Sequence, residues 1–282
     1  MPGNINDNAC RPIGVFDSGY GGLTILKGLR QALPECDYLY LGDNARAPYG
    51  TRSFDLVYEY TLQAVKYLFS QGAPIIVLAC NTASAKALRS IQQNYLPRCL
   101  RPGRRVLGVI RPTVEALPGV SRSGHIGILA TPGTIASHSY RMEIAKIAPQ
   151  LQVTEMAAPM WVPLVENRES DSDGADYFVR KYLDSLFRAD PLIDTVVLGC
   201  THYPLLTGKI RRYLPEGVSL LSQGELTGKS LADYMKRHPD MYARISKGGV
   251  CRFLTTENTA KFNELASLFT GYDIDSRHIE LS

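Results

Sequence analysis

The chain has 282 residues, 45% hydrophobic and 21% charged, which is typical of a globular protein with one large domain or two smaller ones. Its net charge of +4 is spread over short basic groups, so no nucleic-acid partner is expected. The N-terminus is unlike a signal peptide, the apolar runs are too short to cross a membrane, and no CxxC pair is present, which together predict a reduced, cytoplasmic protein.

Short apolar runs alternate with longer amphipathic segments along the chain. Runs such as Ile75–Leu78 are apolar throughout, which is typical of strands buried on both faces of a parallel sheet. In chain order the predicted strands are Ile13–Phe16, Tyr38–Leu41, Ile75–Leu78, Val106–Ile110, Ile126–Leu129, Leu151–Met156 and Val196–Leu198. The predicted helices are residues 53–69, with Ser53 as N-cap, and Tyr177–Phe187 and Ala260–Phe269.

An internal echo divides the chain into two similar halves. The string IGVF at 13–16 reappears as IGIL at 126–129, and VLACNT at 77–82 reappears as VLGCTH at 197–202. We therefore predict an α/β fold of two similar doubly wound domains with parallel sheets, with the active site in the cleft between them. The first domain is expected to comprise residues 1–105 and 215–282, and the second residues 106–214.

Each half presents a cysteine at the end of an apolar strand. A single buried cysteine is usually a packing residue, but Cys80 and Cys200 occupy matching positions. Asn81 and Thr82 offer a helix N-cap after Cys80, and a helix dipole there favours a thiolate. Racemisation requires a base on one face of a carbon and an acid on the other. A thiol, with a reference pKa of about 8.5, can be tuned to serve as either.

Several polar residues follow the other predicted strands. A glycine-rich loop, DSGYGG, begins at Asp17 but lacks the dinucleotide-binding pattern, and Asp43 precedes a Pro-Tyr-Gly turn. Each loop is compatible with ordinary turn chemistry as well as with ligand binding. His202, two residues after Cys200, has either a structural role or the role of orienting the thiol.

Five motifs in this order resemble the glutamate racemases of the aspartate/glutamate racemase superfamily. They are FDSGYGGL at 16–23, GDNARAPYG at 42–50, ACNTASA at 79–85, VPLVE at 162–166 and GCTHYPLL at 199–206. The resemblance implies that Cys80 takes the α-proton from D-glutamate and Cys200 takes it from L-glutamate. It also implies that Asp17 and Asp43 assist Cys80, while Glu166 and His202 assist Cys200.

The resemblance further implies a set of substrate contacts from both halves. They are Asp17, Ser18, Tyr49, Gly50, Asn81, Thr82, Thr131, Thr134, Thr201 and His202. The family uses neither pyridoxal phosphate nor a metal, so no cofactor is expected. It supplies D-glutamate for peptidoglycan, which implies a bacterial cytoplasmic enzyme, and a homodimer is expected on the same basis.

Two details refine this expectation. Related aspartate racemases typically carry CNTAH and GCTE around their cysteines, whereas Ser84 and His202 here favour glutamate. Where the family often has an IDS- or IDP-like segment, this chain has Leu221–Gly224, so contacts between domains or subunits are expected to differ there. The few residues before the first strand predict no dependence on a peptidoglycan-precursor activator.

Three other functions fit parts of the pattern. A cysteine hydrolase with Cys200 as nucleophile and His202 as base lacks the second glycine of a nucleophile elbow and leaves Cys80 without a role. A periplasmic-type amino-acid-binding protein also has two α/β lobes but requires a signal peptide. A zinc site built from Cys80, Cys200 and His202 has only three ligands.

Overall fold

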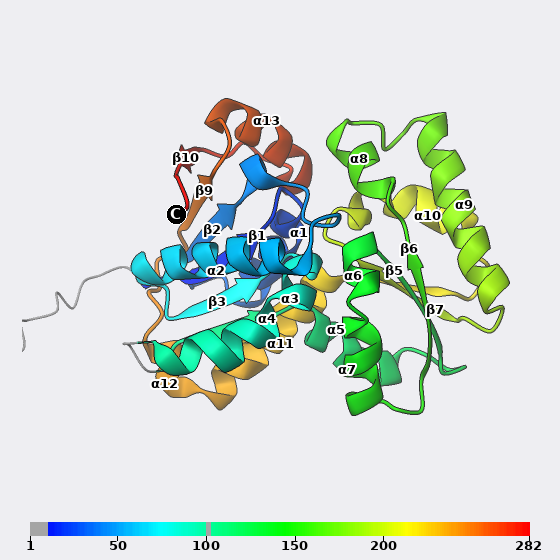
Figure 1. The fold of residues 1–282 in the computed structure, drawn as a ribbon, viewed down its shortest axis with the longest axis horizontal. Helices are drawn as coiled ribbons and strands as arrows, with labels where there is room; N and C mark the ends of the chain where they lie inside the picture. The colour runs from blue at the N-terminus through cyan, green and yellow to red at the C-terminus, as the bar shows by residue number, and fades with distance from the viewer. Residues whose placement is uncertain (1–10, 100–102) are drawn as a thin grey trace, which may run out of the picture.

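The computed structural model describes residues 11–99 and 103–282, in two lobes that lie side by side (Figure 1). Cys10, expected to be a packing or surface residue, lies outside these ranges. Within them, no helix has both the length and the apolar character needed to cross a bilayer.

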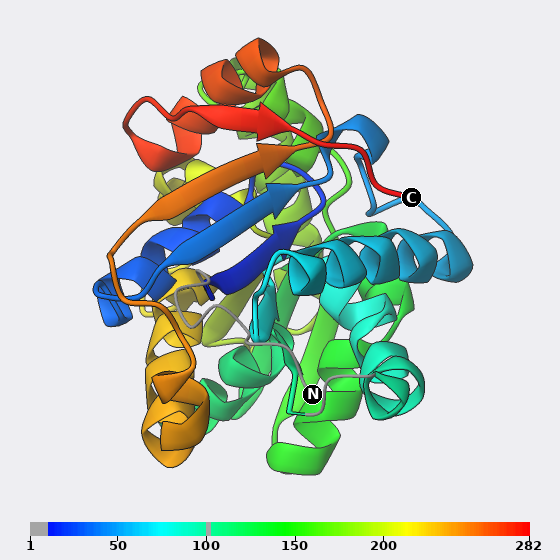
Figure 2. The ribbon, with the colours of Figure 1, turned by 90° about the vertical axis from the view of Figure 1, so that its left-hand side faces the viewer.

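The first lobe is built on a six-stranded parallel sheet in the order β10-β9-β2-β1-β3-β4. Its strands are β1 (Ile13–Asp17), β2 (Tyr38–Gly42), β3 (Ile75–Leu78), β4 (Arg105–Gly108), β9 (Cys251–Thr255) and β10 (Ser276–His278). Figure 2 faces this sheet, in which β10 (red), β9 (orange), β2 and β1 (blue) follow one another.

Helices cover both faces of the first sheet. They are α1 (Gly22–Ala32), α2 (Phe54–Ser70), α3 (Asn81–Lys86), α4 (Leu88–Ser90), α11 (Gln223–Arg237), α12 (Pro239–Ala243) and α13 (Thr259–Thr270), with short 3₁₀ or π turns at Asn44–Arg46, Ile91–Tyr95 and Leu96–Arg98. Because successive strand residues point to opposite faces, Val15 packs in one apolar cluster with Leu26 of α1, whereas Phe16 packs in another with Val57 of α2.

The second lobe has a four-stranded parallel sheet in the order β6-β5-β7-β8. Its strands are β5 (His125–Ala130), β6 (Gln152–Ala157), β7 (Thr195–Gly199) and β8 (Ser219–Leu221). Its helices are α5 (Ile110–Ala116), α6 (Pro132–Ala136), α7 (Ser139–Ile147), α8 (Trp161–Glu166), α9 (Asp173–Ala189) and α10 (Thr207–Tyr213), with 3₁₀ turns at Leu117–Gly119 and Tyr203–Leu206.

The two sheets repeat one topology, which confirms the predicted fold class. The order β2-β1-β3-β4 in the first lobe is matched by β6-β5-β7-β8 in the second. The echoed strings occupy equivalent strands, since 13–16 lies in β1 and 126–129 in β5. The chain reverses its winding between β1 and β3 in the first sheet and between β5 and β7 in the second. Such a switch point opens a crevice at the carboxyl ends of the strands. Cys80 follows β3 and Cys200 follows β7, so each lies at a switch point.

Most predicted elements agree with the structure, with small shifts. Helix α2 begins after Ser53, whose hydroxyl accepts a hydrogen bond from the Leu56 N–H, as expected of an N-cap. The predicted helices Tyr177–Phe187 and Ala260–Phe269 lie inside α9 and α13. The predicted strand Val106–Ile110 is wrong at its end, because Val109 already has helical dihedral angles and Ile110 begins α5.

The strands next to both chain crossings belong to the opposite lobe from the one expected. β4 pairs with β3 in the first sheet, although most of it falls in the range 106–214 expected for the second domain. β8 pairs with β7 in the second sheet, although it falls in the range 215–282 expected for the first. The expected domain limits therefore need correcting, and we propose that the chain crosses between the lobes at residue 109 and after residue 221.

The chain returns to the first lobe through α11, which packs closely along α1. A Cβ at Gly28 would overlap the Gly224 carbonyl, and a Cβ at Gly228 would overlap the Gly28 carbonyl. The absence of side chains at these glycines lets the two helix backbones touch. This contact fixes where α11 begins relative to the first sheet.

The partly buried carboxylate of Asp194 joins the loop at residues 121–123 to the start of β7. Asp194 accepts hydrogen bonds from the Ser121 hydroxyl at 2.6 Å, the Thr195 hydroxyl at 2.9 Å, and the N–H groups of Arg122 and Ser123 at 2.6 and 2.7 Å. Burial alone would raise the pKa of Asp194, but these hydrogen bonds outweigh it and hold the pKa well below its usual range.

We expect Asp194→Ala to lower the free energy of unfolding by about 2–4 kcal/mol, because four donors lose their charged acceptor. The exposed Asp184→Ala on α9 is the control, with an expected change below about 0.5 kcal/mol. Urea titrations measure both. The pKa of Asp194 is depressed in the folded protein. The difference in the free energy of unfolding between the wild type and Asp194→Ala is therefore largest above about pH 4, and it shrinks as the pH falls through the folded pKa. A difference that does not vary with pH would contradict this account.

Candidate active site

The two cysteines lie at equivalent strand ends but in different local structures. Cys80 is itself the N-cap of α3, one residue earlier than expected, and its sulfur accepts a hydrogen bond from the Ala83 N–H at 3.4 Å. Cys200 follows β7 and leads instead into the short 3₁₀ turn that begins at Tyr203. Both side chains are 6% exposed, so the structure holds the thiols in a closed site.

The loop after β1 brings polar groups to Cys80. The Ser18 hydroxyl lies 3.3 Å from the Cys80 sulfur. The Asp17 carboxylate is buried, and its Oδ2 accepts a hydrogen bond from the Gly19 N–H at 2.9 Å. Its Oδ1 is also buried and has no hydrogen-bond partner in the described part of the chain. One carboxylate oxygen beside the thiol is therefore available to a ligand.

The same glycine-rich loop packs against the second lobe. A Cβ at Gly21 would overlap Thr201 Oγ1 and His202 Nδ1, so only glycine permits this approach. The Thr24 hydroxyl of α1 also contacts the Thr201 carbonyl, at 3.2 Å. The Asp17–Cys80 and Cys200–His202 groups consequently belong to one site.

A chain of contacts runs outward from Cys200. Its sulfur lies 3.9 Å from His202 Nδ1, and His202 Nε2 lies 2.9 Å from Glu166 Oε1. Glu166 is the last residue of α8. The ring of Phe269, from α13 of the first lobe, meets the imidazole edge-on at 5.5 Å between centroids. The imidazole is thus held between a thiol and a carboxylate, with an apolar wall beside it.

These neighbours favour a positively charged imidazole. Burial alone would lower the pKa of His202, but its hydrogen bonds and charge interactions with Cys200 and Glu166 outweigh burial and raise the pKa to about 10. The surroundings of His202 therefore favour its protonated form. An imidazolium 3.9 Å from the Cys200 sulfur attracts negative charge to it.

The Cys80 thiol has the opposite surroundings. Burial raises the pKa of Cys80 to about 12, and the Asp17 carboxylate adds to this, against hydrogen bonds from Ser18 and the Ala83 N–H. Burial likewise raises the pKa of Asp17, against the charge of His202. The expectation that the helix dipole would favour a Cys80 thiolate is thus wrong here, because desolvation outweighs the N-terminus of a six-residue helix.

Asp43 is fully buried in the first lobe. Its Oδ1 accepts a hydrogen bond from the Thr256 hydroxyl at 2.9 Å, and its Oδ2 accepts from Arg46 Nε at 2.7 Å and from the Tyr49 hydroxyl. Both oxygens are therefore occupied, and Asp43 holds the loop that carries Tyr49 and Gly50. The Gly50 carbonyl in turn accepts a backbone hydrogen bond at 2.7 Å from Gly133 of the second lobe.

Three buried threonine hydroxyls meet across the lobes. Thr82 Oγ1 lies 3.0 Å from Thr131 Oγ1 and 3.2 Å from Thr134 Oγ1, and the latter two are 3.1 Å apart. Thr82 belongs to α3, whereas Thr131 and Thr134 begin α6. The three predicted contact residues are thus brought together.

Two residues from the Cys80 motif face the interior of the fold. Both polar atoms of the Asn81 side chain are bonded, the oxygen to Tyr140 and the nitrogen to Gln223. Ser84 donates to the Leu78 carbonyl and accepts from the Val109 N–H. Sequence reasoning missed Gln223 and Tyr140. The only signal was that Gln223 falls in the segment that departs from the family pattern.

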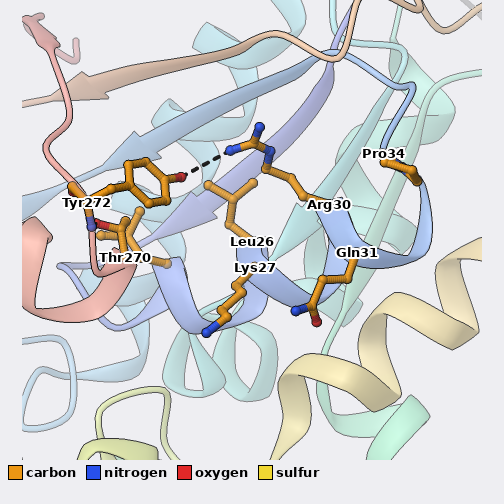
Figure 3. Close-up of a pocket in the computed structure, with 8 residues that line it drawn as sticks. Leu26, Lys27, Arg30, Gln31, Pro34, Thr270 and Tyr272 are labelled. Carbon is orange, nitrogen blue, oxygen red and sulfur yellow. Dashed lines mark hydrogen bonds between the residues drawn. The ribbon is translucent and has the colours of Figure 1, made fainter.

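Two surface cavities have neither Cys80 nor Cys200 in their linings. One, of about 220 Å³, lies between α1 and the end of α13, where Arg30 donates to the Tyr272 hydroxyl at 3.0 Å (Figure 3). Another, of about 740 Å³, is lined by residues of α3, α5, α7 and α11. Among residues 11–99 and 103–282, no three His, Cys, Asp or Glu side chains are grouped as metal ligands would be.

Comparison with known proteins gives consistent matches over most of the chain. The family model described as Asp/Glu/Hydantoin racemase matches residues 22–227. A glutamate racemase from Ruegeria sp. (strain TM1040) is 38% identical over 272 residues, which cover 93% of this chain and 97% of that protein.

Solved structures agree with the sequence matches. Glutamate racemase from Bacillus anthracis has a TM-score of 0.87 at 34% identity, covering 97% of this chain and 99% of its own. Glutamate racemase from Francisella tularensis in complex with D-glutamate has a TM-score of 0.84 at 31% identity, covering 96% and 97%. The chain therefore belongs to the Asp/Glu/Hydantoin racemase family, among its glutamate racemases.

Proposed function

We propose that this chain interconverts L- and D-glutamate by moving the α-proton between Cys80 and Cys200. The observation that carries the proposal is the placement of two buried thiols at equivalent switch points of two lobes with one topology. Glutamate as the substrate rests on the glutamate racemases among the relatives, one of which was solved with D-glutamate.

The electrostatics support a division of roles between the thiols. Starting from L-glutamate, a Cys200 thiolate beside the His202 imidazolium removes the α-proton, and the electron pair of the C–H bond moves toward the substrate carboxylate. The Cys80 thiol, held protonated by its raised pKa, then delivers a proton to the opposite face. From D-glutamate the same steps run in reverse, with Cys80 as base.

The polar residues around the thiols supply substrate contacts in this proposal. The free Asp17 Oδ1 suits the substrate ammonium, and the Ser18 hydroxyl lies beside Cys80. The hydroxyls of Thr82, Thr131, Thr134 and Thr201, and the N–H groups at the start of α3, suit the substrate carboxylates, where negative charge develops. Asp43 acts through Tyr49 and Gly50, Asn81 through its backbone, and Glu166 through His202.

On the basis of its family, we also propose that the protein is a cytoplasmic homodimer that needs no cofactor. Its role would be to supply D-glutamate for peptidoglycan.

Incubation of either enantiomer in D₂O tests the reaction. We expect loss of optical rotation together with α-deuterium in the product, without added cofactor, because each turnover delivers a proton from a solvent-exchanged thiol. Cys80→Ser and Cys200→Ser should each lower racemisation at least about 100-fold, since a hydroxyl is a much weaker acid than a thiol and is not ionised near neutral pH to act as the base. Cys99→Ser, at a half-buried position in the first lobe, is the matched control and should retain activity. Racemisation that survives either active-site substitution, or that requires pyridoxal phosphate, would rule out the two-thiol mechanism.

The charge of His202 is a second test. In ¹⁵N-histidine NMR of the substrate-free protein, we expect both ring nitrogens of His202 to stay protonated at pH 8 and to titrate near pH 10, because Cys200 and Glu166 stabilise the imidazolium. Glu166→Gln should lower this midpoint by about one unit or more, since a carboxylate partner is lost. The signal that is missing from the spectrum of His202→Gln is the one that belongs to His202. A wild-type midpoint near the reference value of about 6.5 would refute the imidazolium beside Cys200.

A further inference from the structure

Gln223, the first residue of α11, is buried in a polar cluster that no motif predicted. Its amide nitrogen donates to the Tyr140 hydroxyl at 2.8 Å and the Thr113 hydroxyl at 2.9 Å, and lies 3.2 Å from the Val109 carbonyl. Its amide oxygen accepts from the Asn81 amide at 2.5 Å. The Gln223 side chain thus contacts three other side chains, from α3, α5 and α7, and one backbone carbonyl at the chain crossing.

Three of these groups form a closed ring of hydrogen bonds. Asn81 donates to Gln223, Gln223 donates to Tyr140, and Tyr140 donates back to the Asn81 amide oxygen at 2.7 Å. Thr113 donates its own proton to the Val109 carbonyl at 2.8 Å, so it accepts from Gln223. Only one orientation of each amide satisfies every bond, and the ring is buried, where a broken bond is costly.

The ring lies where the chain crosses between the lobes. Val109 is the first crossing, between β4 and α5, and Gln223 follows the second crossing, after β8. Asn81 comes from the first lobe and Tyr140 from the second. Any opening of the lobes must pivot about these bonds or break them.

The ring also reaches the proposed catalytic thiol. Asn81 is bonded through the chain to Cys80, the N-cap of α3, so the ring holds the first turn of this helix. We propose that Gln223 is a positioning residue that fixes the Cys80 thiol through Asn81 and ties it to the closed arrangement of the lobes. This inference rests on the two-thiol racemase function proposed above.

The departure of the segment Leu221–Gly224 from the family pattern fits this role. The sequence led us to expect altered contacts between domains or subunits there. Gln223 makes an inter-lobe contact in this segment, through a side chain that reaches α7 and α3 at once.

Two substitutions break the ring with little change of volume. Gln223→Met removes all the polar contacts of the amide, and Tyr140→Phe removes one hydroxyl. Gln223→Glu is the isosteric comparison, which replaces the donating nitrogen with an acceptor. Gln92→Met is the matched control, because the Gln92 amide donates to the Val106 carbonyl at 2.8 Å within the first lobe only.

The readout is kcat and KM in both directions, measured on full-length protein well below its melting temperature. The equilibrium constant between enantiomers is one, so kcat/KM must stay equal in the two directions for every variant. We expect Gln223→Met and Tyr140→Phe to lower kcat about 10- to 100-fold, because a small displacement of Cys80 slows proton transfer. The isotope effect on kcat with α-deuterated D-glutamate should rise above that of the wild type, since Cys80 is the base in this direction. Gln223→Glu should behave like Gln223→Met, and Gln92→Met like the wild type.

A purely structural role predicts something different. Gln223→Met and Tyr140→Phe would then lower the melting temperature but leave kcat and its isotope effect unchanged, and this result would overturn the inference. If Gln223→Met fails to fold, kcat and its isotope effect in Tyr140→Phe test the inference, because this variant removes only the Tyr140 hydroxyl from the ring and leaves the Gln223 amide in place. A wild-type protein that does not racemise glutamate would refute the proposed function itself, whereas a racemase unaffected by these variants would refute only the role of Gln223.

Discussion

The carboxyl ends of the two parallel sheets face each other, and glycine residues permit the closest contacts between the lobes. Gly21 of the first lobe lies directly against Thr201 and His202 of the second, and Gly50 and Gly133 are joined by a backbone hydrogen bond. These contacts close the site and bury both cysteines. The proposed chemistry of the site depends on this closure, because burial makes each charge act strongly on its neighbours.

Closure gives the two thiols different surroundings despite their equivalent positions. Cys80 faces the Asp17 carboxylate, which with burial favours the neutral thiol. Cys200 faces an imidazole that Glu166 keeps positive. The proposed proton exchange requires one thiol that starts protonated and another that starts ionised, and the repeated topology alone would have made the two thiols alike. The loops after the strands, rather than the strands, create this asymmetry.

The same closure depends on how the chain passes between the lobes. The close packing of α11 on α1 sets the start of α11, and the Gln223 amide there joins both crossings to the first turn of α3. Asn81, which follows Cys80 directly, and Gln223 at the second crossing are therefore neighbours in space, although 142 positions separate them in the chain.

Much of this organisation can be predicted from the sequence, because it depends on local patterns. Apolar runs such as Ile75–Leu78 identify buried parallel strands, and the echo of 77–82 at 197–202 indicates two similar lobes with a cysteine in each. The family motifs locate Asp17, Glu166 and His202. Only the tertiary structure decided what depends on distant neighbours. The pairing of β4 and β8 placed the crossings, burial beside Asp17 reversed the expected ionisation tendency of Cys80, and Gln223 was found to join Asn81 and Tyr140. Periodicity reflects which face of an element is buried, whereas desolvation and buried hydrogen bonds depend on which segments fold against each other.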